Sequence, residues 1–241
     1  MDLGIEGRVA LVTAGSKGLG RASALALAEE GARVVISARG QDALAETEAA
    51  MTTVGAEVLA ISADASEPET PNRLVAATVE RFGGLDILVA NNGGPPRGRA
   101  LEVDDDQLRA ALEANLLTSI RLTREAVPHM RAKGWGRICM ITSYSVKQPI
   151  PTLALSNAAR TALWAWAKTA AADLFPAGIT VNLAAPGLHA TDRVKELGGG
   201  VGPMGDPADF GKTVAFLCSE PAKFISGVAL QVDGGATLGL L

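Results

Sequence analysis

The sequence is poor in cysteine, histidine and tyrosine, and it has no long hydrophobic run. The two cysteines, Cys139 and Cys218, lie in apolar surroundings without metal-ligand spacing, so we expect free buried thiols rather than a disulfide. The two histidines have no carboxylate or cysteine at ligand spacing, so no metal site is expected. No apolar stretch reaches the roughly 18 residues that span a bilayer, and the first residues do not resemble a signal peptide. We therefore expect a cytoplasmic protein that binds no membrane.

An excess of either charge is also missing. The 241 residues carry 22 Lys and Arg against 26 Asp and Glu, and these charges are scattered, so no surface for nucleic acid is expected. Hydrophobic residues make up 48% of the chain, enough for a substantial core, and no linker, repeat or low-complexity tract divides it. The composition indicates a single domain over residues 1–241 with a small molecule as its partner.

Apolar runs alternate with segments of helical periodicity along the chain. Several runs are continuously apolar, as in parallel strands covered by helices on both faces. We therefore predict an α/β fold with a doubly wound, mostly parallel seven-stranded sheet. The strands are predicted at 9–12, 33–37, 58–62, 85–90, 138–142, 179–183 and 228–232. The helices are predicted at 19–30, 41–54, 68–82, 104–133, 155–174 and 207–219.

Two segments, 104–133 and 186–206, carry further predictions. Pro128 lies near the end of the predicted helix 104–133, and proline lacks the amide hydrogen that an interior helical position donates. We expect a kink or a break into two pieces there. Residues 186–206 are rich in glycine and follow a strand, at the edge where open α/β sheets bind ligands. This segment is interpreted either as a mobile substrate lid or as a surface loop.

The sequence Thr13-Ala14-Gly15-Ser16-Lys17-Gly18-Leu19-Gly20 follows the first predicted strand and opens the first helix. Glycine lets the backbone turn tightly and approach a pyrophosphate, while the free N–H groups at a helix start favour an anion. A glycine pattern in this context predicts a dinucleotide-binding turn rather than a purely structural one.

This turn resembles the TGxxxGxG turn of the short-chain dehydrogenase/reductase family, in particular its 3-oxoacyl-ACP reductase-like branch. The resemblance covers roughly residues 5 to 235 and implies a Rossmann-type fold with a nicotinamide cofactor. Asp64 is then expected at the adenine, Asn91 at the adenosine and the residues after Pro186 at the nicotinamide carboxamide. The cofactor-binding residues that we predict are Thr13, Gly15, Ser16, Lys17, Gly18, Leu19, Gly20, Arg39, Asp64, Asn91, Gly93, Arg160, Pro186, Gly187 and Thr191.

The end of the second predicted strand bears on the choice of cofactor. An NAD-binding chain usually has an acid there to hold the adenosine ribose, but this chain reads Ser37-Ala38-Arg39-Gly40. Arg39 and Lys17 can place two cations around a 2′-phosphate, which favours NADP(H) over NAD(H). The alternative is that both are solvated surface cations.

The resemblance fails where the family places its catalytic Tyr-x-x-x-Lys pair. Ser156 stands at the tyrosine position, thirteen residues after Ser143, and Arg160 stands at the lysine position. A serine hydroxyl has no phenol acidity to tune, and a guanidinium stays protonated, although Arg160 can still hold the ribose. Ser143 and Asn115 match the family, so a donor for a carbonyl oxygen and a helix-distorting or water-holding amide are still expected.

Nearby residues could replace the missing proton donor. Tyr144, the single tyrosine, and Lys147 follow Ser143 and could point into the cleft, or they could be packed and solvated respectively. His189 in the 186–206 segment is a further candidate, since histidine is the usual proton donor near neutral pH. We take His129, beside Pro128 in a predicted helix, as structural.

Two functions fit these patterns. The first is an NADP(H)-dependent oxidoreductase acting on a carbonyl or alcohol substrate, with an atypical site made from Ser143, Asn115, Tyr144, Lys147, Ser156 and Arg160. The second is a non-catalytic NADP(H)-binding protein, a redox sensor or partner subunit. The resemblance also implies a homotetramer, with a dimer as the alternative, and the apolar C-terminal run from Ala236 suits subunit contacts.

Overall fold

The predicted parallel sheet is present. The computed structural model describes residues 1–196, 198–199 and 202–240. Its strands pair in the order β3-β2-β1-β4-β5-β6-β7, and every pairing between neighbours is parallel. All the predicted strands are confirmed, with boundaries within three residues of those predicted. They are β1 Val9–Thr13, β2 Arg33–Ala38, β3 Val58–Ser62, β4 Ile87–Ala90, β5 Gly136–Ile141, β6 Ile179–Pro186 and β7 Ala229–Val232.

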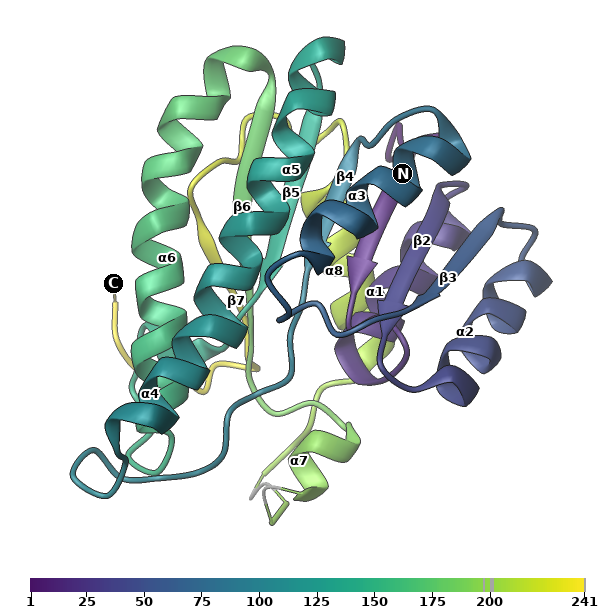
Figure 1. The fold of residues 1–241 in the computed structure, drawn as a ribbon. Helices are drawn as coiled ribbons and strands as arrows, with labels where there is room; N and C mark the ends of the chain where they lie inside the picture. Colours follow the sequence, from purple (N-terminus) through teal and green to yellow (C-terminus); the bar gives the residue numbers. More distant parts are fainter. Residues whose placement is uncertain (197, 200–201, 241) are drawn as a thin grey trace.

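The helices cover both faces of this sheet (Figure 1). They are α1 Gly18–Glu29, α2 Gln41–Thr53, α3 Thr70–Phe82, α4 Asp105–Leu112, α5 Thr118–Lys133, α6 Ala154–Leu174, α7 Asp192–Glu196 and α8 Pro207–Leu217, with the short helices η1 Glu113–Leu117, η2 Tyr144–Val146 and η3 Phe175–Ala177. The helix predicted from residue 68 begins at Thr70, because Pro71 rather than Pro68 occupies its first turn.

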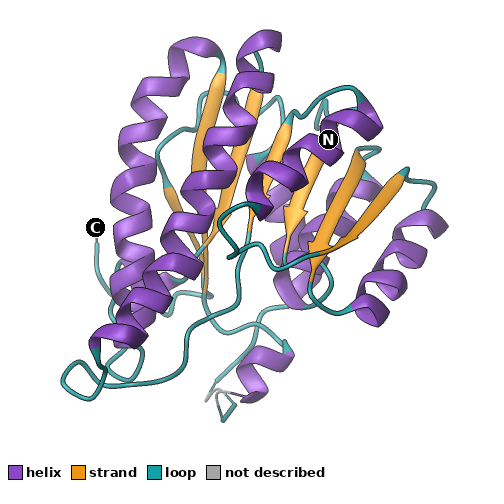
Figure 2. Ribbon diagram, viewed as in Figure 1, coloured by secondary structure: helices purple, strands orange, loops and turns teal. Residues whose placement is uncertain are grey.

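The alternation of side chains along each strand explains the continuous apolar runs. In β1, Val9 and Leu11 pack into the core beneath α3, α5 and α6, whereas Ala10 and Val12 pack beneath α1, α2 and α8. A strand between two helical layers must be apolar on both faces, as the sequence predicted. Figure 2 shows the two helical layers with the sheet between them.

The break predicted at Pro128 is wrong. Pro128 lies inside α5, which continues to Lys133. The predicted helix 104–133 is interrupted earlier, by the π-helix Glu113–Leu117 between α4 and α5. Pro128 removes one main-chain hydrogen bond from α5. Ala126 and Met130, on either side of it, pack into the core, so the helix stays continuous.

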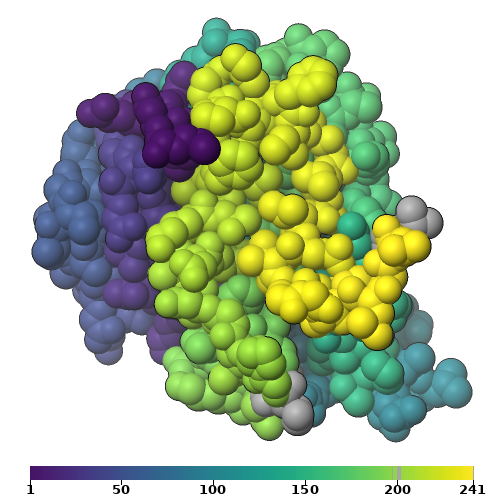
Figure 3. Space-filling model, turned by 180° about the vertical axis from the view of Figure 1, so that it is seen from behind, coloured from purple at the N-terminus to yellow at the C-terminus, as the bar shows by residue number. Residues whose placement is uncertain are grey.

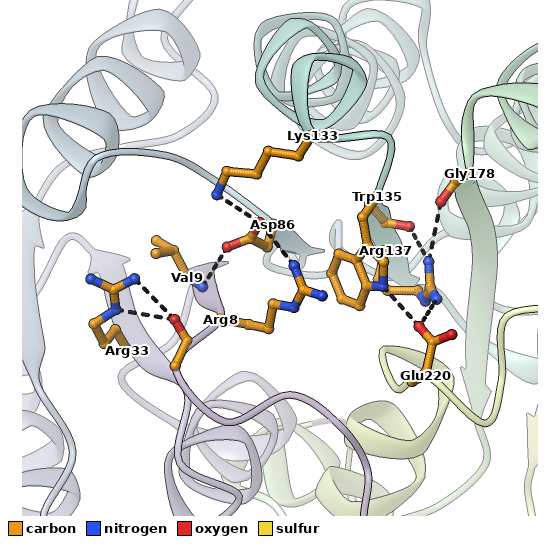
Figure 4. Close-up of polar contacts among 11 residues, drawn as sticks. Arg8, Val9, Arg33, Asp86, Lys133, Trp135, Arg137, Gly178 and Glu220 are labelled. Atoms are coloured by element: carbon orange, nitrogen blue, oxygen red, sulfur yellow. Dashed lines mark hydrogen bonds and ion pairs between the residues drawn. The ribbon is translucent and has the colours of Figure 1, made fainter.

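A polar network closes the amino-terminal end of the sheet (Figure 4). The fully buried guanidinium of Arg137 donates to the Ser219 carbonyl at 2.9 Å and to the Glu220 carboxylate at 3.1 Å, and it stacks on Trp135. Asp86 accepts from the Val9 amide at 2.9 Å and from Lys133 Nζ at 2.7 Å. Both charged groups are therefore paired, and the network lies far from the opposite edge where ligands bind.

The strand order places a ligand crevice at the carboxyl ends of the strands. The order reverses between β1 and β4, and such a switch point opens a crevice outside the strand ends. Helix α7 lies beyond this edge of the sheet (Figure 1).

The C-terminal segment lies on the surface of the molecule, in yellow in Figure 3. In the described part of the chain, no helix combines the length and apolar character of a membrane span.

Candidate cofactor and active site

The backbone of the turn between β1 and α1 is strained at Ala14 and packs closely against α1 at Gly20. Gly15 N donates to the Ser37 carbonyl at 3.0 Å, which ties the turn to β2. The first glycine position of the family pattern is Ala14, not glycine, and Ala14 adopts a left-handed conformation with φ of 45°. A Cβ at Gly20 would overlap the Ala14 carbonyl oxygen, so the helix and the turn meet without room for a side chain.

The start of α1 is open to an anion. Lys17 caps the helix without a side-chain hydrogen bond, and the first turn contains no acidic residue. Among the described residues, no oxygen accepts a hydrogen bond from the N–H groups of Gly18, Leu19 or Gly20. Unpaired N–H groups together with the helix dipole form the physical basis of a phosphate site.

The hydroxyl of Thr13 links the carboxyl end of β1 to Asn91, which follows β4. Thr13 Oγ1 donates to the Asn91 carbonyl at 2.8 Å and accepts from the Asn91 amide at 3.0 Å, while Asn91 Nδ2 donates to the Ala14 carbonyl at 3.3 Å. Thr47 Oγ1 donates to the Ser16 carbonyl at 3.1 Å. The exposed Gly93 follows, with no heavy atom within 4 Å of a Cβ placed on it. The predicted residues Thr13, Ser16 and Asn91 thus lie together around the turn.

A weak ion pair lies just beyond the carboxyl ends of β2 and β3. Arg39 Nη1 lies 3.7 Å from the Asp64 carboxylate, and the Arg39 side chain is 81% exposed. Hydrogen bonds from Ser66 hold the pKa of Asp64 below its ordinary value, with a smaller contribution from the charge of Arg39. Lys17 is exposed and lies close enough to Asp192 to lower the pKa of that carboxylate slightly, behind the larger effect of Lys195. Both predicted cations are therefore exposed at the crevice.

The segment after β5 places Ser143 at the strand end. Ser143 has an extended backbone, and its Oγ accepts from the Ser145 amide at 3.1 Å, so it caps the short helix η2. Tyr144 is half-buried at the start of that helix. Lys147 turns toward β7 and α6: its Nζ donates to Gln231 Oε1 at 3.4 Å and lies 5.7 Å from the centre of the Trp164 ring.

Helix α6 carries both residues at the catalytic-pair positions. Ser156 and Arg160 are buried, at 6% and 7% exposure. Arg160 Nη1 donates to the carbonyls of Ile141 and Thr142 at 2.9 Å and 3.1 Å, at the carboxyl end of β5. Burial, with a further contribution from the charge of Arg193, lowers the pKa of Arg160 to about 10.

Asn115 lies in the middle of the π-helix that interrupts α4 and α5. Its Nδ2 donates to the Ala111 carbonyl at 3.3 Å, and its buried Oδ1 has no partner among the described residues. A π-turn is the local helix distortion that the family resemblance implied for this amide. The unpartnered oxygen is free to accept from a water or ligand.

The segment from Pro186 returns over the crevice. Gly187 N donates to the Val232 carbonyl at 3.0 Å, and a Cβ at Gly18 would lie 3.6 Å from Thr191 Cγ2, so the segment contacts the glycine turn. Arg193 Nη2 donates to the Pro95 carbonyl at 2.7 Å. The predicted lid 186–206 also includes residues 197, 200 and 201, which lie outside the described residues.

His189 is a packed residue rather than an open one. It is 4% exposed, its ring meets Phe210 edge to face at 5.2 Å, and its Nδ1 lies 3.2 Å from the Gly187 carbonyl.

Arg193 was not among the predicted site residues. Its one sequence signal is its place two residues after Thr191, which does not indicate that the side chain crosses to Pro95.

Comparisons with known proteins identify relatives of this chain and of its fold. The family model described as Enoyl-(Acyl carrier protein) reductase matches residues 13–237. Dehydrogenase/reductase SDR family member 4 of Sus scrofa is 34% identical, over 96% of this chain and 88% of its own. The L-sorbose reductase of Gluconobacter frateurii, solved with NADPH and L-sorbose, is 33% identical with a TM-score of 0.93 and full coverage of both chains. A 7α-hydroxysteroid dehydrogenase, solved with NADH and 7-oxoglycochenodeoxycholic acid, is 27% identical with a TM-score of 0.92, over 100% of this chain and 98% of its own.

The fold, the glycine turn and these matches define an oxidoreductase fold of the Rossmann type. The chain belongs to the short-chain dehydrogenase/reductase family.

Proposed function

We propose that this chain is an NADP(H)-dependent oxidoreductase that interconverts a carbonyl and an alcohol through an atypical proton path. One observation carries the proposal: the open start of α1 lies between β1 and Asn91, and the chain retains Ser143 at the end of β5 and Asn115 with an unpartnered side-chain oxygen.

The described residues fit a nicotinamide dinucleotide. The N–H groups of Gly18, Leu19 and Gly20 have no acceptor among the described residues, and Gly20 leaves no side chain between turn and helix. These groups would hold the pyrophosphate, with Asp64 and Asn91 along the adenosine and Gly187 and Thr191 along the nicotinamide side. When bound, the nicotinamide supplies a hydride to a carbonyl carbon or accepts one from an alcohol.

A preference for NADP(H) follows from charge. Arg39 is 81% exposed and its pairing with Asp64 is long, so its guanidinium is available to a 2′-phosphate beside Lys17. Surface ion pairs of this kind contribute little energy, so a phosphate can displace the carboxylate. Arg39→Ala is expected to reduce the ratio of NADPH to NADH affinity about tenfold or more, measured by cofactor fluorescence.

The proton must come from a group other than a phenol on α6. Ser143 lies at the strand end as a hydroxyl donor for the substrate oxygen, and the unpartnered Asn115 oxygen can hold a water. Arg160 keeps a positive charge beneath that strand end. We propose that solvent or Tyr144 delivers the proton, because Lys147 is engaged with Gln231 and Trp164. The reduction consumes one proton for each hydride transferred.

The second candidate is a non-catalytic NADP(H)-binding protein, favoured by the loss of both Tyr and Lys. For either function we propose a small-molecule ligand and a homotetramer, since Phe224, Leu238 and Leu240 are 87%, 86% and 103% exposed. We propose a cytoplasmic setting, because Cys139 and Cys218 are both buried and free.

Oxidation of NADPH against ketones, aldehydes, quinones and 3-oxoacyl thioesters tests the proposal. Turnover that survives Ser156→Ala but falls about 10- to 100-fold with Ser143→Ala supports an oxidoreductase with a rerouted proton. Tight NADPH binding without turnover, with activity appearing in the Ser156→Tyr/Arg160→Lys variant, supports the binding protein. Absence of NADPH binding contradicts both.

A further inference from the structure

The loop 147–153 connects η2 to α6 and lies between two residues of the candidate site. Ser143 caps η2 at the end of β5, and Ser156 lies in the first turn of α6. Ligands bind outside the carboxyl ends of parallel strands, so this loop lies at the edge of the crevice. The position of the loop therefore affects the shape of the crevice wall beside both hydroxyls.

The loop carries two prolines around one isoleucine, in the order Pro149-Ile150-Pro151. Proline fixes its own φ and has no amide hydrogen, so this segment has little backbone freedom and few donors. The Ile150 amide is the only main-chain donor within these three residues. The group that accepts from it therefore decides how the segment is held.

The side-chain amide of Asn157 binds both main-chain groups of Ile150. Asn157 Oδ1 accepts from the Ile150 amide at 3.3 Å, and Asn157 Nδ2 donates to the Ile150 carbonyl at 2.9 Å. We refer to this pair of hydrogen bonds as the Asn157 clamp. The Leu153 amide donates to the same Ile150 carbonyl at 3.0 Å. Two hydrogen bonds from one planar group fix the orientation of Ile150 as well as its distance from α6.

The segment that follows β4 holds the loop from another side. The Gly98 amide donates to the Thr152 carbonyl at 3.0 Å, and the Ala154 amide donates to the Gly98 carbonyl at 3.1 Å. A Cβ at Gly98 would overlap Val103 Cγ1, so a side chain there would displace Val103. The loop is therefore tied both to α6 and to the segment after β4, and neither contact uses a residue of the glycine turn.

We propose that Asn157 is a positioning residue that holds the loop 147–153 as a preset wall of the substrate crevice beside Ser143 and Ser156. The inference rests on the proposed oxidoreductase function, and it deepens that function by naming the residue that sets the shape of the substrate side. Asn157 acts through Ile150 and not on the reacting atoms. A substrate carbonyl then meets a wall that is already in place, so the loop needs no ordering when the substrate binds.

Hydrogen-exchange mass spectrometry of the full chain tests the Asn157 clamp without turnover. The Ile150 amide can be read separately, because Pro149 and Pro151 beside it have no amide hydrogen. Asn157→Ala is expected to raise the exchange rate of this amide about tenfold or more. Asn157→Asp is expected to raise it less, because the carboxylate keeps the acceptor for the Ile150 amide and loses the donor to its carbonyl.

The kinetic experiment measures NADPH oxidation with each carbonyl compound that the wild type reduces. Asn157→Ala is expected to lower kcat/KM for the carbonyl about tenfold, and Asn157→Asp to recover part of the loss. NADPH affinity is expected to stay within about twofold of the wild type, because β4 separates the end of β5 from the glycine turn after β1. A residue that only stabilises the fold would lower the urea midpoint and leave kcat/KM unchanged.

Asn182→Ala is the matched control. Asn182 in β6 also holds a loop through both atoms of its amide, donating to the Ile225 carbonyl at 2.7 Å and accepting from the Val228 amide at 3.2 Å. That loop precedes β7 and lies at the edge of the sheet opposite the crevice. Asn182→Ala is expected to lower the urea midpoint without changing Ile150 exchange or kcat/KM. If it does not fold, Asn72→Ala, which removes one exposed hydrogen bond to Glu125, serves as the control.

Three results would overturn the proposal: an Ile150 amide that exchanges at the wild-type rate in Asn157→Ala, a wild-type kcat/KM in that variant, or an equal loss of kcat/KM in the control variant. A wild type that reduces no carbonyl refutes the oxidoreductase function and the role of Asn157 in it. Turnover with an unchanged Ile150 amide in Asn157→Ala refutes the clamp and leaves the oxidoreductase function standing.

Discussion

The contact between α1 and the glycine turn gives the sharpest stability prediction. A methyl group at Gly20 would overlap the Ala14 carbonyl oxygen and lie 2.6 Å from Asn91 Nδ2 and 3.0 Å from the Ala14 carbonyl carbon. Two of these atoms are backbone of a residue already held at φ of 45°, so the turn has little freedom to retreat. Gly20→Ala must therefore push the helix away from the turn.

The expected magnitude follows from two opposing effects. Overpacking of a buried site costs about 1–3 kcal/mol, whereas alanine within a helix gains about 0.5–1 kcal/mol over glycine. We expect a net loss of about 1–2 kcal/mol in the free energy of unfolding. NADPH affinity is expected to fall at least about tenfold, because the N–H groups of Gly18 and Leu19 move away from the pyrophosphate.

Urea unfolding followed by circular dichroism measures the first quantity, and NADPH fluorescence titration measures the second. Gly40→Ala is the control, because a Cβ there has no heavy atom within 4 Å and φ is −89°, so its stability should change by less than about 1 kcal/mol. A Gly20→Ala protein with the wild-type urea midpoint and wild-type NADPH affinity would refute the packing argument.

Three further predictions concern single positions. Ala14→Gly removes the left-handed strain, worth about 1–2 kcal/mol, and adds chain entropy to the unfolded state, so a net gain of about 0.5–1 kcal/mol is expected in urea unfolding. Arg137→Met leaves the Ser219 carbonyl without its buried donor and is expected to cost about 1–3 kcal/mol by the same measurement, with an unchanged midpoint contradicting the network in Figure 4. Hydrogen bonds from Trp135 and Lys223 lower the pKa of Glu220 below its ordinary 4.5, so its contribution to stability is present above about pH 4.5 and is lost as the pH falls through the lowered value. Urea midpoints from pH 6 to pH 3 should therefore fall less steeply for Glu220→Gln, and equal slopes would contradict the assignment.

The fold was predictable because the central strands are apolar on both faces, which makes them continuous hydrophobic runs in the sequence. Strands β1, β4, β5 and β6 are buried on both faces, so runs such as Ile87–Ala90 are apolar at every position. The helix interruption was placed wrongly, because Pro128 is a strong local signal whereas the π-turn at Asn115 depends on packing against α6. The local sequence predicted the break at Pro128, whereas the structure interrupts the helix at Glu113–Leu117, where tertiary packing favours a π-turn.

The glycine turn of the proposed site was predictable because its geometry depends on residues that lack a side chain. Gly18 has a positive φ, and Gly20 leaves no room for a Cβ beside Ala14, so the glycines mark the turn directly in the sequence. Side-chain direction is different: Lys147 could face the crevice or the edge strand with equal propensity, and only the position of Gln231 and Trp164 decides between them. Arg193 could not be foreseen for the same reason, since its partner Pro95 is 98 residues away in the sequence.

We propose that Ser156 and Arg160 alter the proton path of the family while the scaffold stays the same. Ser156 and Arg160 are both buried in α6, and Arg160 pays part of its desolvation cost through the Ile141 and Thr142 carbonyls that end β5. The serine hydroxyl at position 156 has no phenol acidity to tune, so it does not replace the proton donor that the family places there. The guanidinium at position 160 keeps the positive charge of the family's lysine but stays protonated and cannot relay a proton. The two replacements together therefore remove the proton path through α6 while they keep a buried cation beneath the end of β5.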